Sequence, residues 1–340
     1  MKVTILGGGG FLGRKVAARL AADGALGGRA VESLTLFDLR APPAPPGAPF
    51  PVRALAGDIA DPAALRDAMP AGTGVVFHLA AVVSAAAEAD FDLGMRVNLD
   101  GTRAVVDAAR ALVAAGGPPP RVVFTSSVAS FSGGQGAVLP DDARQTPANS
   151  YGAQKAMGEL LLSDATRRGF LDAVNIRLPT VIVRPGRPNK AASSFVSAIL
   201  REPFLGLPAT YPVPDDFAVW CCSPRRAVEW FLHAATMDTA PMGADRGVNP
   251  PGIAARVSDM LAALEVVGGG AKRAMVRRVP DPAVEAIVSG WPAAFEARRA
   301  RALGFTLQEG LREVLLAFVE DDLEATRAER MADAQGTQGA

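Results

Sequence analysis

The 340-residue chain has few of the side chains that hold metals or form disulfide bonds. It contains two histidines, His78 and His233, and two cysteines, Cys221 and Cys222, which are adjacent. Adjacent cysteines match neither a disulfide framework nor the usual spacing of metal ligands, so we expect no metal site. Lysine plus arginine and aspartate plus glutamate each number 35. This balance gives no electrostatic signature of binding to nucleic acid or to an anionic membrane.

Long apolar runs are also missing, and none reaches the length of a membrane-spanning helix. The start "MKVTILGGGGFLG" has a lysine before an apolar run, as a signal peptide has. The run is very short, however, and it ends in four glycines without a small-residue cleavage pattern. We therefore read it as a strand that enters a loop, and we expect a protein of the reducing cytoplasm.

What the first half does contain is an alternation of short apolar strands and longer helical patterns. Strands are predicted at residues 2–6, 33–38, 52–58, 74–80, 121–127 and 173–179, and helices over about 11–24, from Asp61, over 94–114 and from near Tyr151. The segment "GVVFHLA" is apolar on both faces, as a covered sheet requires. The alternation predicts an α/β Rossmann fold with a doubly wound parallel sheet.

After residue 185 the rhythm changes, because proline and glycine become frequent and the strands become short. We expect residues 1–185 to form a dinucleotide-binding domain and 186–328 a smaller, mixed α/β substrate-binding region interleaved with it. A capping box of Thr306 and Glu309 predicts the start of the final helix. Residues 329–340 are small and polar, which predicts a flexible tail.

The loop after the first strand predicts a dinucleotide site. Gly7, Gly10 and Gly13 have the spacing GxxGxxG between a strand and a helix, where bare backbone and the helix N-terminus favour a diphosphate. Asp38 ends the second strand, where a carboxylate can accept hydrogen bonds from both adenosine ribose hydroxyls and repel a 2′-phosphate. This charge favours NAD over NADP, although Arg14 and Arg40 could bind such a phosphate.

Further cofactor contacts are expected at the ends of the next strands. Asp58 follows Gly57 at the end of the third strand and is placed to contact adenine. Leu79, Ala80 and Ala81 end the fourth strand with side chains that leave space for a cofactor. We expect His78 to be a packed strand residue and not a base.

Tyr151 and Lys155 are the predicted proton-transfer pair. They lie four positions apart and so share one helix face. An ammonium about 4 Å away would lower the pKa of the phenol by up to about 3 units at an effective dielectric near 20. Ser127 ends the strand "RVVFTSS" just upstream, where it can hydrogen-bond a reacting oxygen. The alternative, a surface tyrosine with a solvated lysine, is disfavoured because lysine is scarce in this chain.

Together these motifs resemble the extended short-chain dehydrogenase/reductase family over nearly the whole chain. GxxGxxG, "GDI", "HLAA", Asn98, "TSS" and YxxxK occur in order. The resemblance implies that Tyr151 is the general acid or base, that Lys155 lowers its pKa and binds the nicotinamide ribose, that Ser127 orients the substrate and that Asn98 orders the site. It also implies further cofactor contacts at Phe11, Leu12, Ile59, Pro179 and Val181, and a homodimer formed through a four-helix bundle.

The substrate side departs from the nucleotide-sugar enzymes of the family. Leu178 stands about where these carry an asparagine for the diphosphate, and Val219 where many carry an arginine. A smaller, monoanionic substrate suits this sequence better. Residues that can contact it are Ser84, Ser126, Ser127, Arg184, Ser193, at the start of a predicted helix, and Arg226.

Four segments resemble a branch of the family that oxidises a sugar acid at C2 with NAD: residues 78–103, 150–161, 177–195 and 223–229. This resemblance implies conversion of D-erythronate to 2-oxo-tetronate. Ser130 and Ser132 depart from that branch and lie just beyond Ser127.

Two alternatives remain: a nucleotide-sugar 4-epimerase or dehydratase that retains its NAD, and a catalytically silent dinucleotide sensor. The intact Ser127, Tyr151 and Lys155 argue against the sensor.

Overall fold

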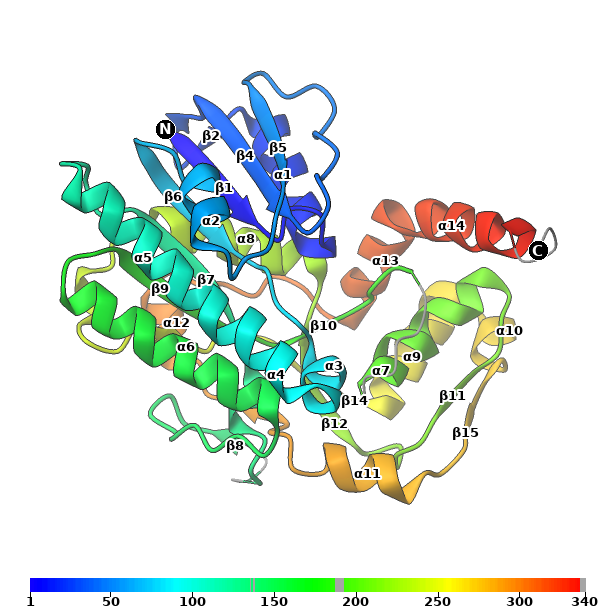
Figure 1. The fold of residues 1–340 in the computed structure, drawn as a ribbon. Helices are drawn as coiled ribbons and strands as arrows, with labels where there is room; N and C mark the ends of the chain where they lie inside the picture. The colour runs from blue at the N-terminus through cyan, green and yellow to red at the C-terminus, as the bar shows by residue number, and fades with distance from the viewer. Residues whose placement is uncertain (135, 137, 187–192, 337–340) are drawn as a thin grey trace.

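The fold is built on one parallel sheet of seven strands (Figure 1). The computed structural model describes residues 1–134, 136, 138–186 and 193–336. The spatial order of the strands is β13 (Gly247–Val248), β9 (Asp172–Leu178), β7 (Arg121–Ser127), β6 (Thr73–His78), β1 (Lys2–Leu6), β4 (Ser33–Asp38) and β5 (Val52–Ala56), and every neighbouring pair is parallel. The six strands predicted for the first half are all present.

Helices cover both faces of this sheet, because its strands carry apolar side chains on both sides. One face is covered by α1 (Phe11–Asp23) and α8 (Pro224–Thr236). The other is covered by α2 (Pro62–Ala68), α5 (Gly101–Ala114) and α6 (Ser150–Arg167). This arrangement confirms the predicted doubly wound α/β fold.

The helix predicted over residues 94–114 is interrupted. It consists of α4 (Phe91–Gly94), a π-helical segment η1 (Met95–Asp100) and α5. Asn98 lies in the π-helical segment and is 2% exposed. Short π-helical segments inside α-helices are frequent at functional sites.

A second, smaller lobe has its own apolar core. It contains the sheet β10 (Thr180–Val181), β12 (Ala218–Cys222) and β14 (Ile253–Arg256), with α7 (Ser194–Arg201), α9 (Val257–Gly268), α13 (Leu311–Asp321) and α14 (Leu323–Gly336) around it. The chain crosses between the lobes more than once, since α8 and β13 pack in the large lobe. The shorter elements are β2 (Ala25–Leu26), β3 (Arg29–Ala30), β8 (Val138–Leu139), β11 (Ala209–Tyr211), β15 (Val276–Arg278), β16 (Ala294–Phe295), α3 (Ser84–Ala89), α10 (Gly270–Arg273), α11 (Pro282–Val288), α12 (Arg298–Ala302) and the 3₁₀ turns η2 (Val128–Phe131), η3 (Glu202–Leu205) and η4 (Ala240–Met242).

One expectation for the C-terminal part is wrong. Thr306 and Glu309 form no capping box, because α13 begins at Leu311 and Glu309 instead accepts hydrogen bonds from Ser223 at the start of α8. The flexibility of residues 329–340 stays a prediction; α14 continues to Gly336, and Arg330 donates to the carboxylate of Glu202 at 2.9 Å. The last four residues, 337–340, lie outside the described part of the chain.

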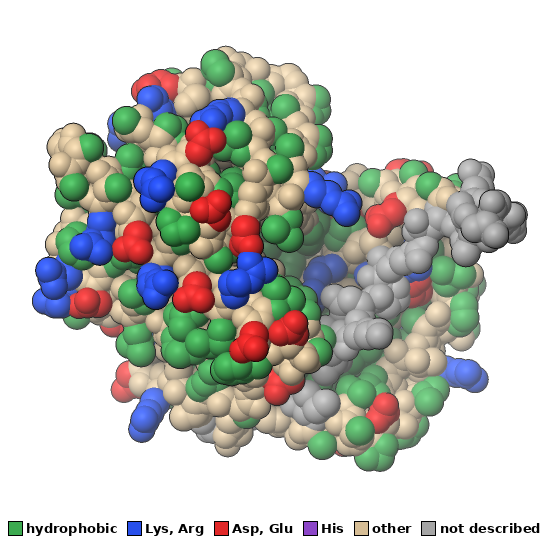
Figure 2. Space-filling model, viewed as in Figure 1, with side chains coloured by type: hydrophobic (Ala, Val, Ile, Leu, Met, Phe, Trp, Pro, Cys, Tyr) green, Lys and Arg blue, Asp and Glu red, His purple; other side chains and the backbone are tan. Residues whose placement is uncertain are grey.

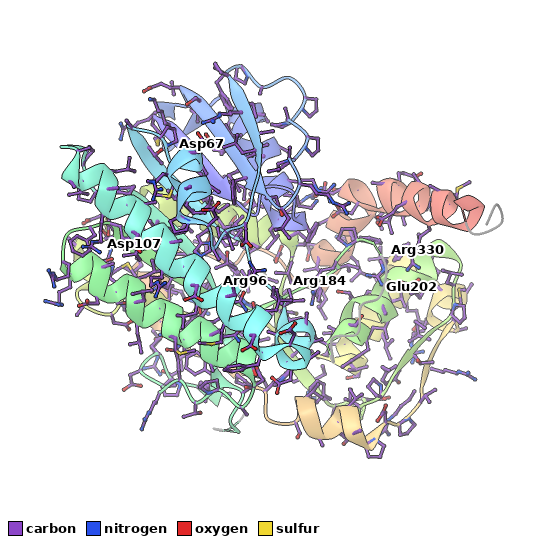
Figure 3. The ribbon with its side chains drawn as sticks, viewed as in Figure 1. Asp67, Arg96, Asp107, Arg184, Glu202 and Arg330 are labelled. Atoms are coloured by element: carbon purple, nitrogen blue, oxygen red, sulfur yellow. The ribbon has the colours of Figure 1, made fainter. Side chains whose placement is uncertain are left out.

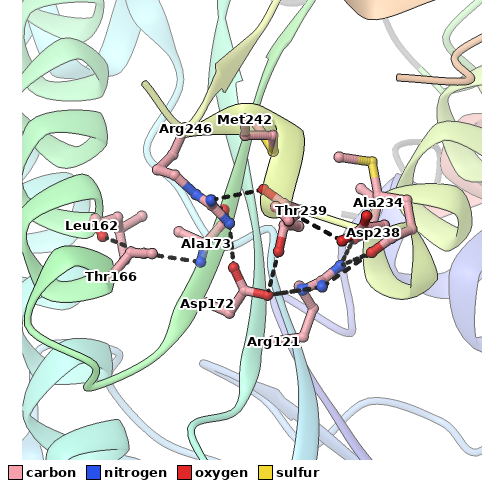
Figure 4. Close-up of polar contacts among 12 residues, drawn as sticks. Arg121, Leu162, Thr166, Asp172, Ala173, Ala234, Asp238, Thr239, Met242 and Arg246 are labelled. Atoms are coloured by element: carbon pink, nitrogen blue, oxygen red, sulfur yellow. Dashed lines mark hydrogen bonds and ion pairs between the residues drawn. The ribbon is translucent and has the colours of Figure 1, made fainter. Parts of the chain in front are cut away.

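A half-buried aspartate ties the short strand β13 to the large sheet (Figure 4). Asp172 begins β9 and accepts hydrogen bonds from Arg121 on β7, at 2.8 Å, and from Arg246, which precedes β13. Thr239 donates to the same carboxylate at 2.8 Å, and Arg121 also donates to the carbonyl of Ala234 in α8. This network lies at the amino ends of the strands, so it supports the scaffold from the end opposite the carboxyl edge. No helix in the described ranges is long and apolar enough to cross a membrane.

Candidate active site

A cavity of about 280 Å³ opens at the carboxyl ends of the sheet strands, between the two lobes. The space-filling view shows this side of the molecule hollowed between the lobes (Figure 2). Such an edge is where open α/β sheets bind their ligands. Many of the predicted site residues line the cavity: Phe11, Leu12, Leu79, Ala81, Ser84, Ser126, Ser127, Tyr151, Lys155, Pro179, Val181, Arg184 and Ser193.

The glycine loop between β1 and α1 is packed too tightly for side chains. Gly7 has φ +89°, and a Cβ there would lie 2.6 Å from the backbone nitrogen of Ala80. A Cβ on Gly13 would lie 2.1 Å from the carbonyl oxygen of Gly7. Gly10 is the N-cap of α1, so the free N–H groups of the first turn face the loop without a capping side chain. The loop therefore fits the diphosphate of a dinucleotide.

Two aspartates end the strands next to this loop. Asp38 accepts hydrogen bonds from the backbone nitrogens of Gly9, at 2.9 Å, and Leu39, at 2.8 Å. A carboxylate has further lone pairs that ribose hydroxyls can use. Asp58 accepts from the nitrogen of Ala60 at 2.9 Å and is paired with Arg96 on η1, and both interactions lower its pKa. Gly101 of α5 packs tightly against Ile59, the next residue.

Helix α6 carries Tyr151 and Lys155 into the cavity. Its N-cap is Asn149, whose side-chain oxygen accepts from the nitrogen of Gly152 at 2.7 Å, so the helix starts just before Tyr151. Ser127 hydrogen-bonds the hydroxyl of Tyr151. The three side chains that were predicted separately thus meet on one wall of the cavity.

The electrostatics of the pair differ from the expectation. Burial raises the pKa of Tyr151, and the hydrogen bond from Ser127 and the charge of Arg184 oppose this rise. The cation that acts on the phenol is therefore Arg184, while the Nζ of Lys155 lies 5.6 Å from the centroid of the Tyr151 ring and 4.6 Å from that of Phe124. Burial also lowers the pKa of Lys155 to about 7. The cost of removing both groups from water is larger here than their mutual attraction.

Asn98 and His78 lie behind the cavity wall. Asn98 exchanges two hydrogen bonds with the backbone of Val82, at 2.9 and 3.0 Å, and donates a third to Gln154 at 2.7 Å. It thereby joins the loop after β6 to α6. His78 is fully buried and lies 3.0 Å from the hydroxyl of Thr102, and burial lowers its pKa to about 3. His78 is thus a packed, neutral strand residue, as predicted.

Within the described part of the chain, Arg184 is the arginine that lines the cavity, and Figure 3 shows it between the two lobes. Ser193, at the N-terminus of α7, and Ser84, at the start of α3, line the same space. Leu178 and Val219, the two positions at which we expect a departure from nucleotide-sugar enzymes, line it too with apolar side chains.

Some expected contacts are not brought together. Arg226 lies in α8, where it pairs with Glu229, and it does not line the cavity. Ser126 lines the cavity, but its hydroxyl donates to Glu159 of α6. Ser130 and Ser132 hold the loop after β7: Ser130 donates to the carbonyl of Ser127 at 2.8 Å, and Ser132 accepts from Asn149 and Ala148.

Other lining residues were missed. Trp220 on β12, together with Trp291 and Pro292 beyond α11, closes the cavity from the smaller lobe. Thr125 and Thr180 add hydroxyls at strand ends. Two of the three tryptophans of the chain lie here, and this scarcity is the one sequence signal that could have marked them.

Comparison with known proteins gives consistent matches. A model of the NAD dependent epimerase/dehydratase family matches residues 3–212. The D-erythronate dehydrogenase of Cupriavidus necator is 48% identical over 94% of this chain and 98% of its own length. That of Haemophilus influenzae is 38% identical over 95% of this chain and 100% of its own.

Among solved structures, one described as the nucleoside-diphosphate-sugar epimerase from Agrobacterium tumefaciens is 46% identical, with a TM-score of 0.90, and the match covers 95% of each chain. The family model covers more than half of the chain, and the glycine loop fits a dinucleotide diphosphate. The chain therefore belongs to the NAD-dependent epimerase/dehydratase family and is an enzyme that uses NAD.

Proposed function

We propose that this protein is an NAD-dependent dehydrogenase that oxidises D-erythronate at C2 to 2-oxo-tetronate (2-dehydro-D-erythronate). The observation that carries the proposal is the convergence of Ser127, Tyr151, Lys155 and Arg184 on one small cavity beside the glycine loop. The names of two relatives that match over nearly their whole length support this substrate. An acid–base pair and one arginine are what the oxidation of a hydroxy acid requires.

In the proposed reaction Tyr151 removes the proton of the C2 hydroxyl, and Ser127 holds the same oxygen by a hydrogen bond. NAD, when bound, supplies the nicotinamide C4 that takes the hydride from C2. Together the two transfers remove one proton and one hydride and leave a ketone. Lys155 would bind the nicotinamide ribose, and the charge of Arg184 favours the phenolate of Tyr151. Asn98 keeps α6 and the loop after β6 in register through its bonds to Val82 and Gln154.

The glycine loop and Asp38 would hold the dinucleotide, together with Leu79, Ala80, Ala81, Pro179 and Val181 around the nicotinamide end. Arg184 would bind the substrate carboxylate, since among the described residues it is the arginine that lines the cavity. Ser193, the N-cap residue of α7, lines the same cavity and would assist. Arg226, paired with Glu229 in α8, is left out of this assignment.

A nucleotide-sugar epimerase that retains its NAD is the second candidate, because the Agrobacterium tumefaciens structure bears that name. Leu178 and Val219 weigh against it: they present apolar side chains to the cavity, where a dianionic diphosphate needs donors.

The test is an assay of NADH absorbance with NAD and a panel of four- to six-carbon sugar acids. We expect D-erythronate to be oxidised and Tyr151→Phe to abolish turnover while NAD binding persists. The other tyrosine, Tyr211, is buried, so the chain offers no exposed tyrosine for a control substitution. Leu207→Met in the second lobe, at a side chain 41% exposed, serves as the conservative control. Absence of turnover with every acid, together with conversion of a UDP- or GDP-sugar, would overturn the proposal in favour of the epimerase.

The assembly and compartment stay predictions. A homodimer through α5 and α6 is consistent with the apolar side chains that Met157 and Leu160 of α6 expose, 36% and 71%. Light scattering of wild type and Leu160→Arg tests it.

The two buried, free cysteines suit a reducing cytoplasm. Residues 1–185 would bind NAD and carry Ser127, Tyr151 and Arg184, and 186–328 would complete the substrate site with Ser193 and the side chains of the smaller lobe that line the cavity.

A further inference from the structure

A buried charge cluster lies behind the wall that carries the predicted proton-transfer pair. Glu159 of α6 is 4% exposed and accepts hydrogen bonds from three side chains. Arg177 of β9 donates at 2.9 and 3.0 Å, Gln145 donates at 2.8 Å, and Ser126 of β7 donates through its hydroxyl. We call these four residues the Glu159 cluster. Neither the glycine loop nor the substrate contacts involve its two charges.

Packing around the guanidinium group of Arg177 holds it against the carboxylate of Glu159. It is 7% exposed, and its guanidinium carbon lies 5.3 Å from the centroid of the Phe131 ring. Gly247 of β13 leaves room for it, since a Cβ there would lie 2.4 Å from an Arg177 nitrogen. A buried arginine held in this way cannot turn to solvent if its partner is lost. Its uncompensated positive charge would then act on the nearest ionisable side chains.

Lys155 lies one helical turn before Glu159, on the same face of α6, and Glu159 in turn is paired with Arg177. Burial lowers the pKa of Lys155 to about 7, and Glu159 raises it. The other groups that face Lys155 are His78 of β6, which is neutral, and Tyr151 of α6. Arg184 faces Tyr151 from beyond β10.

The cluster also reaches the end of β7. Gln145 donates both to Glu159 and to the hydroxyl of Ser130, at 3.0 Å, and Ser130 donates to the carbonyl of Ser127. Ser126, the neighbour of Ser127, is bound to Glu159 directly. One carboxylate therefore links the strand that carries Ser127 to the helix that carries Tyr151.

We propose that Glu159 is a positioning residue of the active site: it neutralises Arg177 one helical turn away from Lys155 and fixes the end of β7 at Ser127. The kinetic part of this inference rests on the proposed dehydrogenase function, but the charge of Lys155 can be followed without any substrate. The chain contains five lysines, Lys2, Lys15, Lys155, Lys190 and Lys272, so the ε-carbon of each gives a separable NMR signal after ¹³C labelling. Lys155→Met assigns the signal of interest.

The experiment titrates that signal in the wild type, Glu159→Gln and Arg177→Met. Loss of the carboxylate should lower the titration midpoint of Lys155 by at least about one pH unit, because an uncompensated cation then faces it. Loss of Arg177 should raise the midpoint, because Glu159 then has no competing cation. The double variant Glu159→Gln, Arg177→Met should return toward the wild type. Merely structural damage would move both single variants in one direction.

Movement of both midpoints downward, or an unchanged midpoint in Glu159→Gln, would overturn the proposal. If circular dichroism shows that one single variant does not fold, the titration midpoint of Lys155 is compared between the double variant, which removes both buried charges together, and the single variant that does fold. In kinetics we expect Glu159→Gln to lower kcat by about tenfold or more with little change in the KM for NAD. A wild type inactive on every sugar acid would refute the function, while the titration result would still decide the role of Glu159.

Discussion

Gly13→Ala should separate NAD binding from the rest of the fold. The new Cβ would lie 2.1 Å from the carbonyl oxygen of Gly7 and 3.0 Å from the Cα of Gly8. An ordinary contact is about 3.4 Å, so the loop and the first turn of α1 must separate by about 1 Å. Overpacking of this kind costs roughly 1–3 kcal/mol. The displaced N–H groups would no longer converge on the diphosphate, and we expect the Kd for NAD to rise about 10- to 100-fold.

Isothermal titration with NAD and urea unfolding measure the two effects separately. The matched control is Gly74→Ala in β6, where a Cβ would meet nothing closer than 3.8 Å. Its affinity for NAD should equal that of the wild type, and its free energy of unfolding should be unchanged or higher by up to about 1 kcal/mol, because alanine restricts the unfolded chain. If Gly13→Ala binds NAD within about threefold of the wild type and unfolds at the same urea concentration, the steric reasoning about this loop is wrong.

Two further predictions concern charge. Burial lowers the pKa of His78 to about 3, so the unfolded chain binds a proton at this residue more tightly than the folded protein does. The free energy of unfolding therefore falls as the pH drops below about 6.5, and between pH 7 and pH 5 the loss is about 2 kcal/mol. Urea unfolding at the two pH values should show that loss reduced by this amount in His78→Gln, and an equal pH dependence in both proteins would contradict it. Arg184→Met should raise the KM for the sugar acid at least about tenfold while the KM for NAD stays constant, since a charge-assisted hydrogen bond is lost. Arg312→Met, at a side chain 63% exposed, is the control, and an unchanged KM in Arg184→Met would move the carboxylate site elsewhere.

The features that could be predicted depend on local spacing. Tyr151 and Lys155 share a face because they are four residues apart in a helix, and the glycines of the loop follow a strand directly. The spacing of Thr306 and Glu309 predicted a capping box, but Glu309 instead accepts a hydrogen bond from Ser223. This bond could not be predicted from local spacing, because its two partners are 86 residues apart. The direction of Ser126 was in principle readable, since it alternates with Ser127 along β7.

The sequence by itself determined the parallel sheet, the dinucleotide loop and the Ser127, Tyr151 and Lys155 set, because periodicity and short-range spacing specify strands, helices and the faces they present. Only the tertiary structure separated Arg184 from Arg226, which look alike in sequence, since Arg184 lines the cavity and Arg226 pairs with Glu229. It also decided the charge states. Burial makes Lys155 and Tyr151 harder to ionise, and burial is a property of packing between distant segments.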